Sequence, residues 1–258
     1  GRVTRESLKK RLKEKLPFAF ALEEIAVKKK IPILEPFYDD RHGVPNLTIL
    51  SPSKSFYQSL LPDFRAINEI TEKEEESLLD EILKSLNSAC SWLDEFWDEE
   101  NLAEPAEDAT SSENISSTVL HFDFDGKKVL LTADAGVSSL EHAADNADSS
   151  FITLKDYKFM QVPHHGSKRN VGPTILDRVL GDKAESQSTS TTTTCFVSAA
   201  VKGEPKHPSK RVVNAFIRRG AKVVSTQGVS KSHRSGTPSR EGWNTAESHS
   251  FYEKVEDD

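Results

Sequence analysis

The sequence predicts an α/β fold in which helices and strands form layers around one sheet. In the second half of the chain, apolar runs of strand length alternate with amphipathic stretches of helix length, which is typical of layered α/β and α+β domains. Two strand-like runs, residues 118–124 and 127–133, are joined by Asp125-Gly126, a dipeptide that favours a type I′ hairpin turn. A chain of 258 residues is also long enough to bury a substantial apolar core.

The first part of the chain is predicted to be rich in helix. Apolar residues at helical spacing indicate helices over 4–29, which Pro17 splits in two, and over 53–61. Short strand-like runs are expected at 31–34 and 47–50.

An acidic helical arm is predicted to follow. Residues 66–97 have an apolar stripe at helical spacing with an acidic outer face, whereas residues 99–112 have no periodicity and are expected to form a mobile loop. Residues 66–113 carry sixteen acidic and only two basic side chains. The acidic helix 66–98 is therefore a candidate docking site for a regulatory protein.

The second half supplies most of the predicted sheet. The expected elements are a helix at 135–148, a strand at 158–162, a helix at 171–180, a strand at 195–199, a helix at 208–219 and strands at 222–225 and 251–254. The chain then divides into residues 1–65, the arm at 66–116, and residues 117–258, which include a Ser/Thr-rich loop at 185–194.

Positive charge is concentrated near the C-terminus. Residues 206–240 carry nine Lys and Arg and no Asp or Glu, although the whole chain has a net charge of −7. Because a basic face attracts phosphate groups, a nucleic acid is a candidate substrate in spite of the acidic average.

Composition excludes some classes of protein. No apolar run approaches the ~20 residues of a membrane-spanning helix, so an integral membrane protein is excluded and no membrane contact is expected from this chain. The two cysteines show no disulfide or metal-binding spacing, which favours a reducing, cytoplasmic location. Since the chain begins with Gly1 rather than Met, we expect a fragment of a longer protein or a processed product.

Polar clusters follow two of the predicted strands. Asp134 follows the first strand, and Pro163-His164-His165-Gly166-Ser167 follows the second. Ligand sites of α/β layers lie at the carboxyl ends of strands, and carboxylate and imidazole ligands suit zinc or manganese. We therefore predict Asp134, His164 and His165 as metal ligands. The alternative is that Asp134 only caps the next helix and that the His pair is incidental.

Other short motifs accompany these clusters in a fixed order. They are residues 47–52, Asn114-Ile115-Ser116-Ser117, residues 130–134, residues 162–167, Ser198, His207-Pro208 and residues 223–226. Their order resembles that of the metallo-β-lactamase-fold hydrolases, in particular the branch at the C-terminus of the bacterial DNA-uptake (competence) channel protein. The resemblance covers about residues 30–227, and His-His-Gly-Ser is its most specific motif.

The resemblance implies an αββα sandwich of which this chain forms the C-terminal part, with two divalent metal ions, zinc or manganese, at its edge. It implies that Asp134 bridges the metals and is catalytically essential, and that one of His164 and His165 is a ligand. The residues implied to face a substrate phosphate are Ser167, Ser198, His207, Lys210 and Arg211.

The main metal motif of that family, His-x-(His or Asp)-x-Asp-His, is missing from this chain. The nearest pattern, at residues 121–125, lies in the predicted hairpin. We expect its polar residues to face solvent and Leu120, Phe122 and Phe124 to face the core. Ala133 also replaces the glycine that usually precedes the aspartate in the family. An N-terminal half, cleaved from this chain or encoded separately, is therefore expected to supply the other ligands.

Together these features predict a metal-dependent hydrolase of phosphodiesters, a nuclease acting on DNA, that is active only with its N-terminal half. Two alternatives stay open. One is a small-molecule metallo-hydrolase, whose activity salt would barely affect. The other is an inactive or regulatory half that docks a partner protein through the acidic arm.

Overall fold

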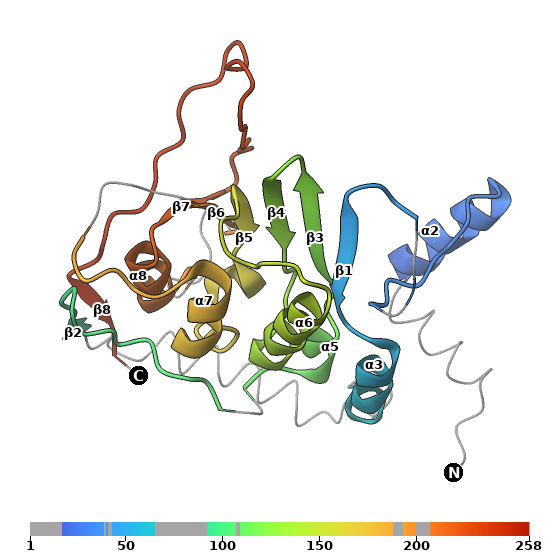
Figure 1. The fold of residues 1–258 in the computed structure, drawn as a ribbon, viewed down its shortest axis with the longest axis horizontal. Coiled ribbons are helices and arrows are strands. Elements are labelled where there is room, and N and C mark those ends of the chain that lie inside the picture. The colour runs from blue at the N-terminus through green and yellow to red at the C-terminus, as the bar shows by residue number, and fades with distance from the viewer. Residues whose placement is uncertain are drawn as a thin grey trace.

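The computed structural model describes residues 17–38, 40, 43–64, 92–106, 109–187, 193–199 and 207–257. Its central sheet contains β1 (Leu47–Ser51), β3 (Val119–Phe124), β4 (Lys127–Leu131), β5 (Phe159–Gln161), β6 (Thr193–Val197) and β7 (Ala221–Ser225). The six strands follow one another in this order across the sheet (Figure 1). Strand β3 is antiparallel to both β1 and β4, whereas β4 to β7 run parallel.

Three helices pack on one face of this sheet: α6 (Val137–Ser149), α7 (Pro173–Leu180) and α8 (Lys210–Arg218) (Figure 1). Two shorter helices, α3 (Lys54–Leu60) and α5 (Ser112–Ile115), contact each other, and α5 also contacts α6. The 3₁₀ turns η1 (Leu61–Asp63) and η2 (Pro163–Gly166) follow α3 and β5. The α/β layered fold predicted from the sequence is therefore confirmed.

Helix α2 (Pro17–Lys28) lies apart from the sheet (Figure 1). It begins at the proline expected to divide the N-terminal helical stretch, and the part of that stretch before residue 17 lies outside the described residues. None of its side chains is buried, and Phe18 is 85% exposed. Within the described residues, no helix has both the length and the apolar character that a membrane span requires.

The core lies between the sheet and the three packed helices. Leu130, Met160, Cys195 and Val223 are register partners on successive strands, so their side chains share this face. All four belong to one buried cluster with apolar side chains of the helices, which include Leu140, Ala143, Ala147, Ile175, Leu176, Val179, Val212, Val213 and Phe216.

The predicted hairpin between β3 and β4 is present. Asp125 and Gly126 both have left-handed φ values, 54° and 80°, as a type I′ turn requires. The Asp123 carboxylate also accepts a hydrogen bond of 2.7 Å from the backbone N–H of Gly126. The turn chemistry of these residues thus fixes the register of the two strands.

The opposite face of the sheet is apolar too, although α6, α7 and α8 all lie on the other side. Leu120, Phe122, Val129, Phe159 and Phe196 share this face by register, and each is only partly buried. A parallel sheet is normally covered on both faces. This sheet therefore presents an apolar surface that the described helices of the core leave open.

The prediction for residues 121–125 was wrong about which side faces the core. His121 is 4% exposed on the helix side, whereas Phe124, expected in the core, is 48% exposed on the open face. The buried imidazole forms a 2.9 Å hydrogen bond with the Tyr157 hydroxyl, and burial lowers the pKa of His121. Alternation alone cannot choose between the faces when both carry apolar residues.

Other expected elements differ from the structure. Residues 31–34 are exposed and form no strand; Pro32 has no N–H for a sheet ladder. Residues 92–98 are not helical, because Trp92–Asp94 forms β2, which pairs with β8 (Lys254–Glu256) in a separate small sheet. That last strand begins three residues later than expected. Residues 66–91 of the acidic arm and 188–192 of the Ser/Thr-rich loop lie outside the described residues.

The described part of the acidic arm is fastened to α8 by buried arginine side chains. Arg218 forms an ion pair with Glu95, and both side chains are fully buried. Arg218 also donates hydrogen bonds of 3.0, 2.6 and 2.7 Å to the backbone carbonyls of Trp97, Phe96 and Glu99. The neighbouring Arg219 pairs with Glu100 and Asp177. Two cations of the basic region, Arg218 and Arg219, are thus neutralised by ion pairs within the protein.

Residues 99–106 lack regular structure, as expected, but they are held in place. Leu102 is buried in the core cluster. The Glu104 carboxylate accepts a 2.8 Å hydrogen bond from the Thr174 N–H in the first turn of α7, where an anion is favoured. The prediction of a mobile loop therefore does not describe this stretch.

Candidate functional site

The predicted metal ligands follow two neighbouring parallel strands. Asp134 follows β4, and His164 and His165 lie in the η2 turn that follows β5. Two hydrogen bonds join the strand ends: Thr132 Oγ1 to the Gln161 carbonyl, 2.9 Å, and the His164 N–H to the Ala133 carbonyl, 3.1 Å. The sheet thus brings together polar groups that are thirty residues apart in the sequence.

The backbone of both turns is strained. Ala133, His164 and His165 have φ values of 47°, 40° and 57°, in the left-handed region that non-glycine residues rarely adopt. Each such residue costs about 1–3 kcal/mol, and residues of this kind cluster at functional sites. Ala133 therefore takes a conformation that glycine adopts without strain.

Two amide side chains that the sequence did not single out support these turns. Gln161 Oε1 accepts hydrogen bonds from the N–H groups of Thr132 and Ala133, at 3.3 and 3.2 Å. The buried Asn170 side chain donates to the carbonyls of Asp134 and Ala135, at 3.1 and 3.2 Å. Neither amide lies in a recognisable motif; the only sequence signal is that each lies within six residues of the His pair.

Asp134 and His164 face each other at a distance suited to shared metal coordination. Asp134 Oδ1 and His164 Nδ1 are 3.4 Å apart, longer than an ordinary hydrogen bond. The Nδ1 atom is buried and has no hydrogen-bond partner among the described residues. Two ligands of one tetrahedral ion, each bound at ~2.0–2.1 Å, are about 3.3–3.4 Å apart. The pair could therefore hold a divalent metal such as zinc, and its separation equally suits a long ion pair between the two side chains.

His165 is held differently from His164. Its ring is exposed, and its Nδ1 donates a 2.7 Å hydrogen bond to the carbonyl of Ser198, at the end of β6. This bond fixes the tautomer of the neutral ring and leaves Nε2 as the unprotonated nitrogen. The two imidazoles thus have distinct chemical settings.

The His207-Pro208 segment lies beside the His pair. Gly166 has φ of 77°, and a Cβ atom placed there would be 2.7 Å from Pro208 Cβ, so only glycine fits this contact. The Ser209 N–H also donates to the Gly166 carbonyl at 3.0 Å. His207 is exposed at this junction, whereas Ser167 is buried and its hydroxyl accepts from the Arg169 N–H at 3.2 Å.

Lys210 and Arg211, also predicted to face the substrate, contact other parts of the protein. The Lys210 ammonium lies 4.1 Å from the ring centroid of Trp92 and 5.0 Å from that of Tyr252. Arg211 is buried, and its Nη1 donates to the Asn101 carbonyl at 3.4 Å. The first turn of α8 faces the acidic 92–104 segment, which sequence spacing could not reveal.

Asp134 and His164 alone could supply only part of a metal coordination sphere. Among the residues that the structure describes, no group of three or more His, Cys, Asp or Glu side chains is arranged to hold a metal ion. A tetrahedral ion needs four ligands. Further ligands would have to come from elsewhere.

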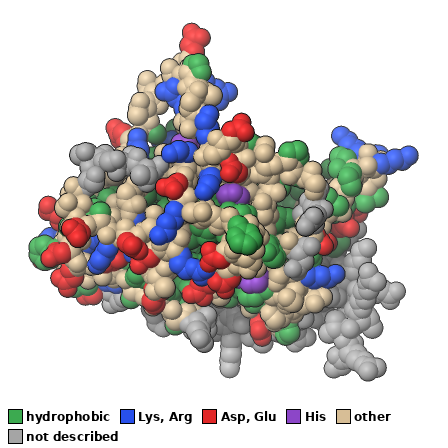
Figure 2. All heavy atoms as spheres, in the orientation of Figure 1, with side chains coloured by type: hydrophobic (Ala, Val, Ile, Leu, Met, Phe, Trp, Pro, Cys, Tyr) green, Lys and Arg blue, Asp and Glu red, His purple; other side chains and the backbone are tan. Residues whose placement is uncertain are grey.

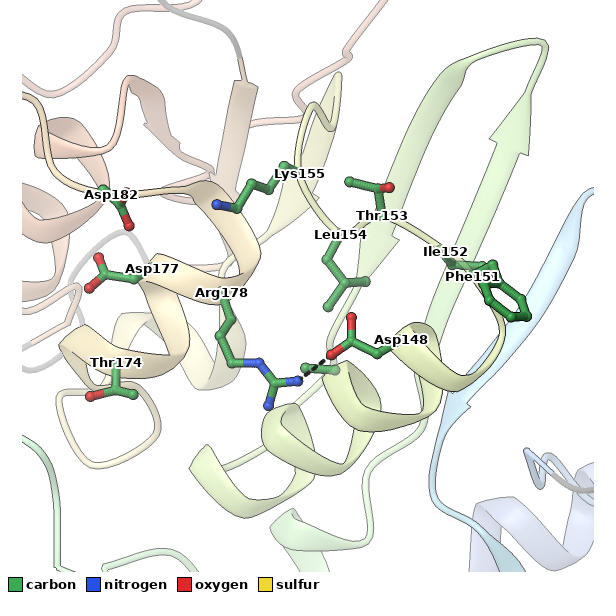
Figure 3. Close-up of a pocket in the computed structure, with 11 residues that line it drawn as sticks. Asp148, Phe151, Ile152, Thr153, Leu154, Lys155, Thr174, Asp177, Arg178 and Asp182 are labelled. Carbon is green, nitrogen blue, oxygen red and sulfur yellow. Dashed lines mark hydrogen bonds and ion pairs between the residues drawn. The ribbon is translucent and has the colours of Figure 1, made fainter.

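A separate cavity of about 770 Å³ lies between α6 and α7 (Figure 3). Arg178 lines it and pairs with Asp145 at 3.0 Å and with Asp148 at 2.8 Å. Lys155, Asp177 and Asp182 are its other charged lining residues. None of the predicted site residues lines this cavity, and its arginine already has two carboxylate partners, so we assign no ligand to it.

No protein-family model matches this chain, and no curated protein or solved structure is detectably similar to it.

Proposed function

We propose that this chain carries part of the metal site of a hydrolase that cleaves phosphodiesters, a nuclease acting on DNA. The observation that supports this most is the pairing of Asp134 with the otherwise unpartnered, buried His164 Nδ1 at 3.4 Å, between two strained turns. The proposal also draws on the resemblance to metallo-β-lactamase-fold hydrolases.

In this proposal, the Asp134 carboxylate and His164 Nδ1 hold a divalent zinc or manganese ion. Such an ion would polarise the phosphoryl oxygen and lower the pKa of a water molecule. Gln161 and Asn170 keep the two ligand-bearing turns in place. His165, oriented by the Ser198 carbonyl, and His207 are the groups available to contact the substrate.

A second polypeptide segment completes the site in this proposal. The open face of the sheet is apolar, and His233 covers it only at Phe159 among the side-chain ring contacts described. Covering the rest with a second sheet would form the sandwich that the resemblance implies. The same N-terminal half would bring the ligands that the described residues lack. Its removal should therefore abolish tight metal binding as well as activity.

A small-molecule hydrolase is the second candidate. It is favoured by one observation: Lys210 and Arg211, the expected phosphate contacts, are engaged by Trp92, Tyr252 and Asn101. Salt separates the two candidates, because the affinity for a polymer falls steeply with ionic strength.

The test is cleavage of fluorescently labelled DNA by the chain together with its N-terminal half, with zinc or manganese added. Asp134→Asn and His164→Gln should each lower the rate more than a hundredfold, and the matched Asp63→Asn, at an exposed position in η1, should leave it unchanged. Full cleavage by Asp134→Asn contradicts the proposal. Cleavage of small esters but not DNA supports the second candidate instead.

A further inference from the structure

The amino ends of the parallel strands form a row of lysines. Lys127 begins β4, Lys158 precedes β5 and Lys222 lies near the start of β7. Backbone bonds fix this row: the Lys158 N–H donates to the Lys128 carbonyl, and the Lys158 carbonyl accepts from Thr194, the register partner of Lys222. The backbones of the three lysines therefore lie at the edge of the sheet opposite to the one that carries Asp134, and register places Lys127 and Lys222 on the same face as Phe159.

A long excursion of the chain, residues 226–248, adds more cations to this edge. It leaves the end of β7 and projects beyond the body of the protein before it returns (Figure 1). The His233 ring packs on Phe159 at 5.3 Å between centroids, and Gly236 lies against the Lys127 ammonium. The excursion carries Lys231, Arg234 and Arg240, and Lys and Arg atoms are visible on it in Figure 2.

The excursion also presents an aromatic ring. Trp243 is 41% exposed, and the Arg240 guanidinium carbon lies 5.0 Å from its ring centroid. An exposed aromatic ring flanked by cations is what a single-stranded nucleic acid requires, because its bases stack on the ring while its phosphates meet the cations. A basic patch alone would not distinguish single strands from duplexes.

These cations are not neutralised by neighbouring carboxylates. Within the described parts of the chain, Lys127, Lys158 and Lys222 form no ion pair with Asp or Glu. The acidic side chains nearest in sequence to the three lysines are Asp125 and Asp156, and residues 226–248 also carry Glu241 and Glu247. By contrast, Arg218 and Arg219, from the same basic region of the sequence, are fully paired inside the protein, so the usable positive charge is at this edge.

We propose that this amino-edge surface, formed by Lys127, Lys158, Lys222, Lys231, Arg234, Arg240 and Trp243, binds single-stranded nucleic acid. This rests on the proposed function, for which it provides a second contact with the polymer, away from Asp134. A β-strand of five residues spans about 17 Å, which is the distance between the two edges of the sheet. A single-stranded nucleic acid of several nucleotides is therefore long enough to contact both the amino-edge surface and Asp134. The surface would hold the polymer without taking part in its cleavage.

The test measures binding of a fluorescein-labelled 20-nucleotide thymidine oligomer by anisotropy, in EDTA and over a range of salt concentrations. The variant carries Lys127→Gln, Lys158→Gln and Lys222→Gln. We expect at least tenfold weaker binding at 0.1 M salt, and a slope of log affinity against log salt that is smaller by about 2, since each phosphate contact contributes ~0.7. Far-ultraviolet circular dichroism confirms that the variant is folded.

The matched control removes the same charge at the end of α2 and in the turn that follows it, through Lys28→Gln, Lys29→Gln and Lys30→Gln, all exposed. It should bind as the unchanged protein does. Trp243→Ala should weaken binding of the oligomer about 5- to 100-fold and leave binding of a duplex unchanged. The proposal would be overturned if the two triple-lysine variants lost oligomer affinity equally, or if the variant at Lys127, Lys158 and Lys222 lost none.

Failure of this proposal can be told apart from failure of the proposed function. If the oligomer binds normally through the amino edge but the complete enzyme cleaves no DNA, the binding surface is supported and the proposed nuclease activity is contradicted. Cleavage of DNA that depends on Asp134, without any effect of the amino-edge triple, contradicts the surface alone.

Discussion

Replacing Arg218 by Met should destabilise the protein strongly. The guanidinium is completely buried, pairs with the completely buried Glu95 and donates to three backbone carbonyls of residues 96–99. Methionine fills similar space but leaves the Glu95 charge and three carbonyls without their partner. Breaking a buried ion pair in this way costs about 3–5 kcal/mol. That is a large share of the 5–15 kcal/mol that typically stabilises a folded domain.

The chain contains a matched control for this change. Arg178 also pairs with two carboxylates, those of Asp145 and Asp148, but its side chain is one-third exposed and its partners are more exposed still. Because solvent screens such pairs, Arg178→Met should cost less than about 1 kcal/mol. The comparison separates burial from the mere presence of an ion pair.

The assay is urea unfolding followed by circular dichroism, with the free energy of unfolding taken by linear extrapolation. Pairing Arg218→Met with Glu95→Leu should recover part of the loss, since no uncompensated charge then stays buried. If Arg218→Met costs no more than Arg178→Met, the acidic 92–104 segment is not part of the folded core. In that case our description of α8 and its partners is wrong.

Two further predictions concern the turn at the site and the response to pH. Gly166→Ala should destabilise the protein by more than about 1 kcal/mol in thermal unfolding, because the residue has a left-handed φ and its new Cβ would collide with Pro208. Gly126→Ala introduces similar backbone strain in open space and should therefore cost less stability. Equal losses of stability in the two variants would refute the contact with Pro208. Burial lowers the pKa of His121 and His249, so the unfolded chain binds protons more readily below pH ~6.5. Stability should therefore be fully present above that pH and fall as the pH drops further, and His249→Gln should flatten this dependence in urea unfolding at several pH values.

Turn chemistry and helix periodicity were the most reliable sequence signals. Asp125-Gly126 located the hairpin because few other dipeptides adopt two left-handed conformations. The helices at 137–149 and 173–180 matched their amphipathic stretches because each buries one apolar side against the sheet.

The face on which a strand residue lies could not be predicted in the same way. Phe122 and Phe124 are more apolar than His121, yet the histidine faces the helices, because Tyr157 satisfies its ring nitrogen. Hydrophobicity ranks side chains one at a time, whereas burial depends on a hydrogen-bond partner far along the chain.

The candidate site was only partly visible in the sequence. The strand-end rule placed Asp134 and the His pair together, since β4 and β5 are neighbours. It could not show that Lys210 contacts aromatic rings, because Trp92 was expected on a helix and lies instead on β2. Long-range pairing of an irregular segment leaves no periodic signal.

Metal binding by Asp134 and His164 is the most direct test of the central claim. Zinc and manganese would be titrated into the chain assembled with its N-terminal half, by isothermal calorimetry at pH 7.5. The variants Asp134→Asn, His164→Gln and the exposed Asp156→Asn would be compared under the same conditions. We expect binding by the unchanged chain and by Asp156→Asn, and an affinity more than tenfold weaker in each of the other two variants. Equal affinity in all four proteins would contradict the assignment of this pair as metal ligands.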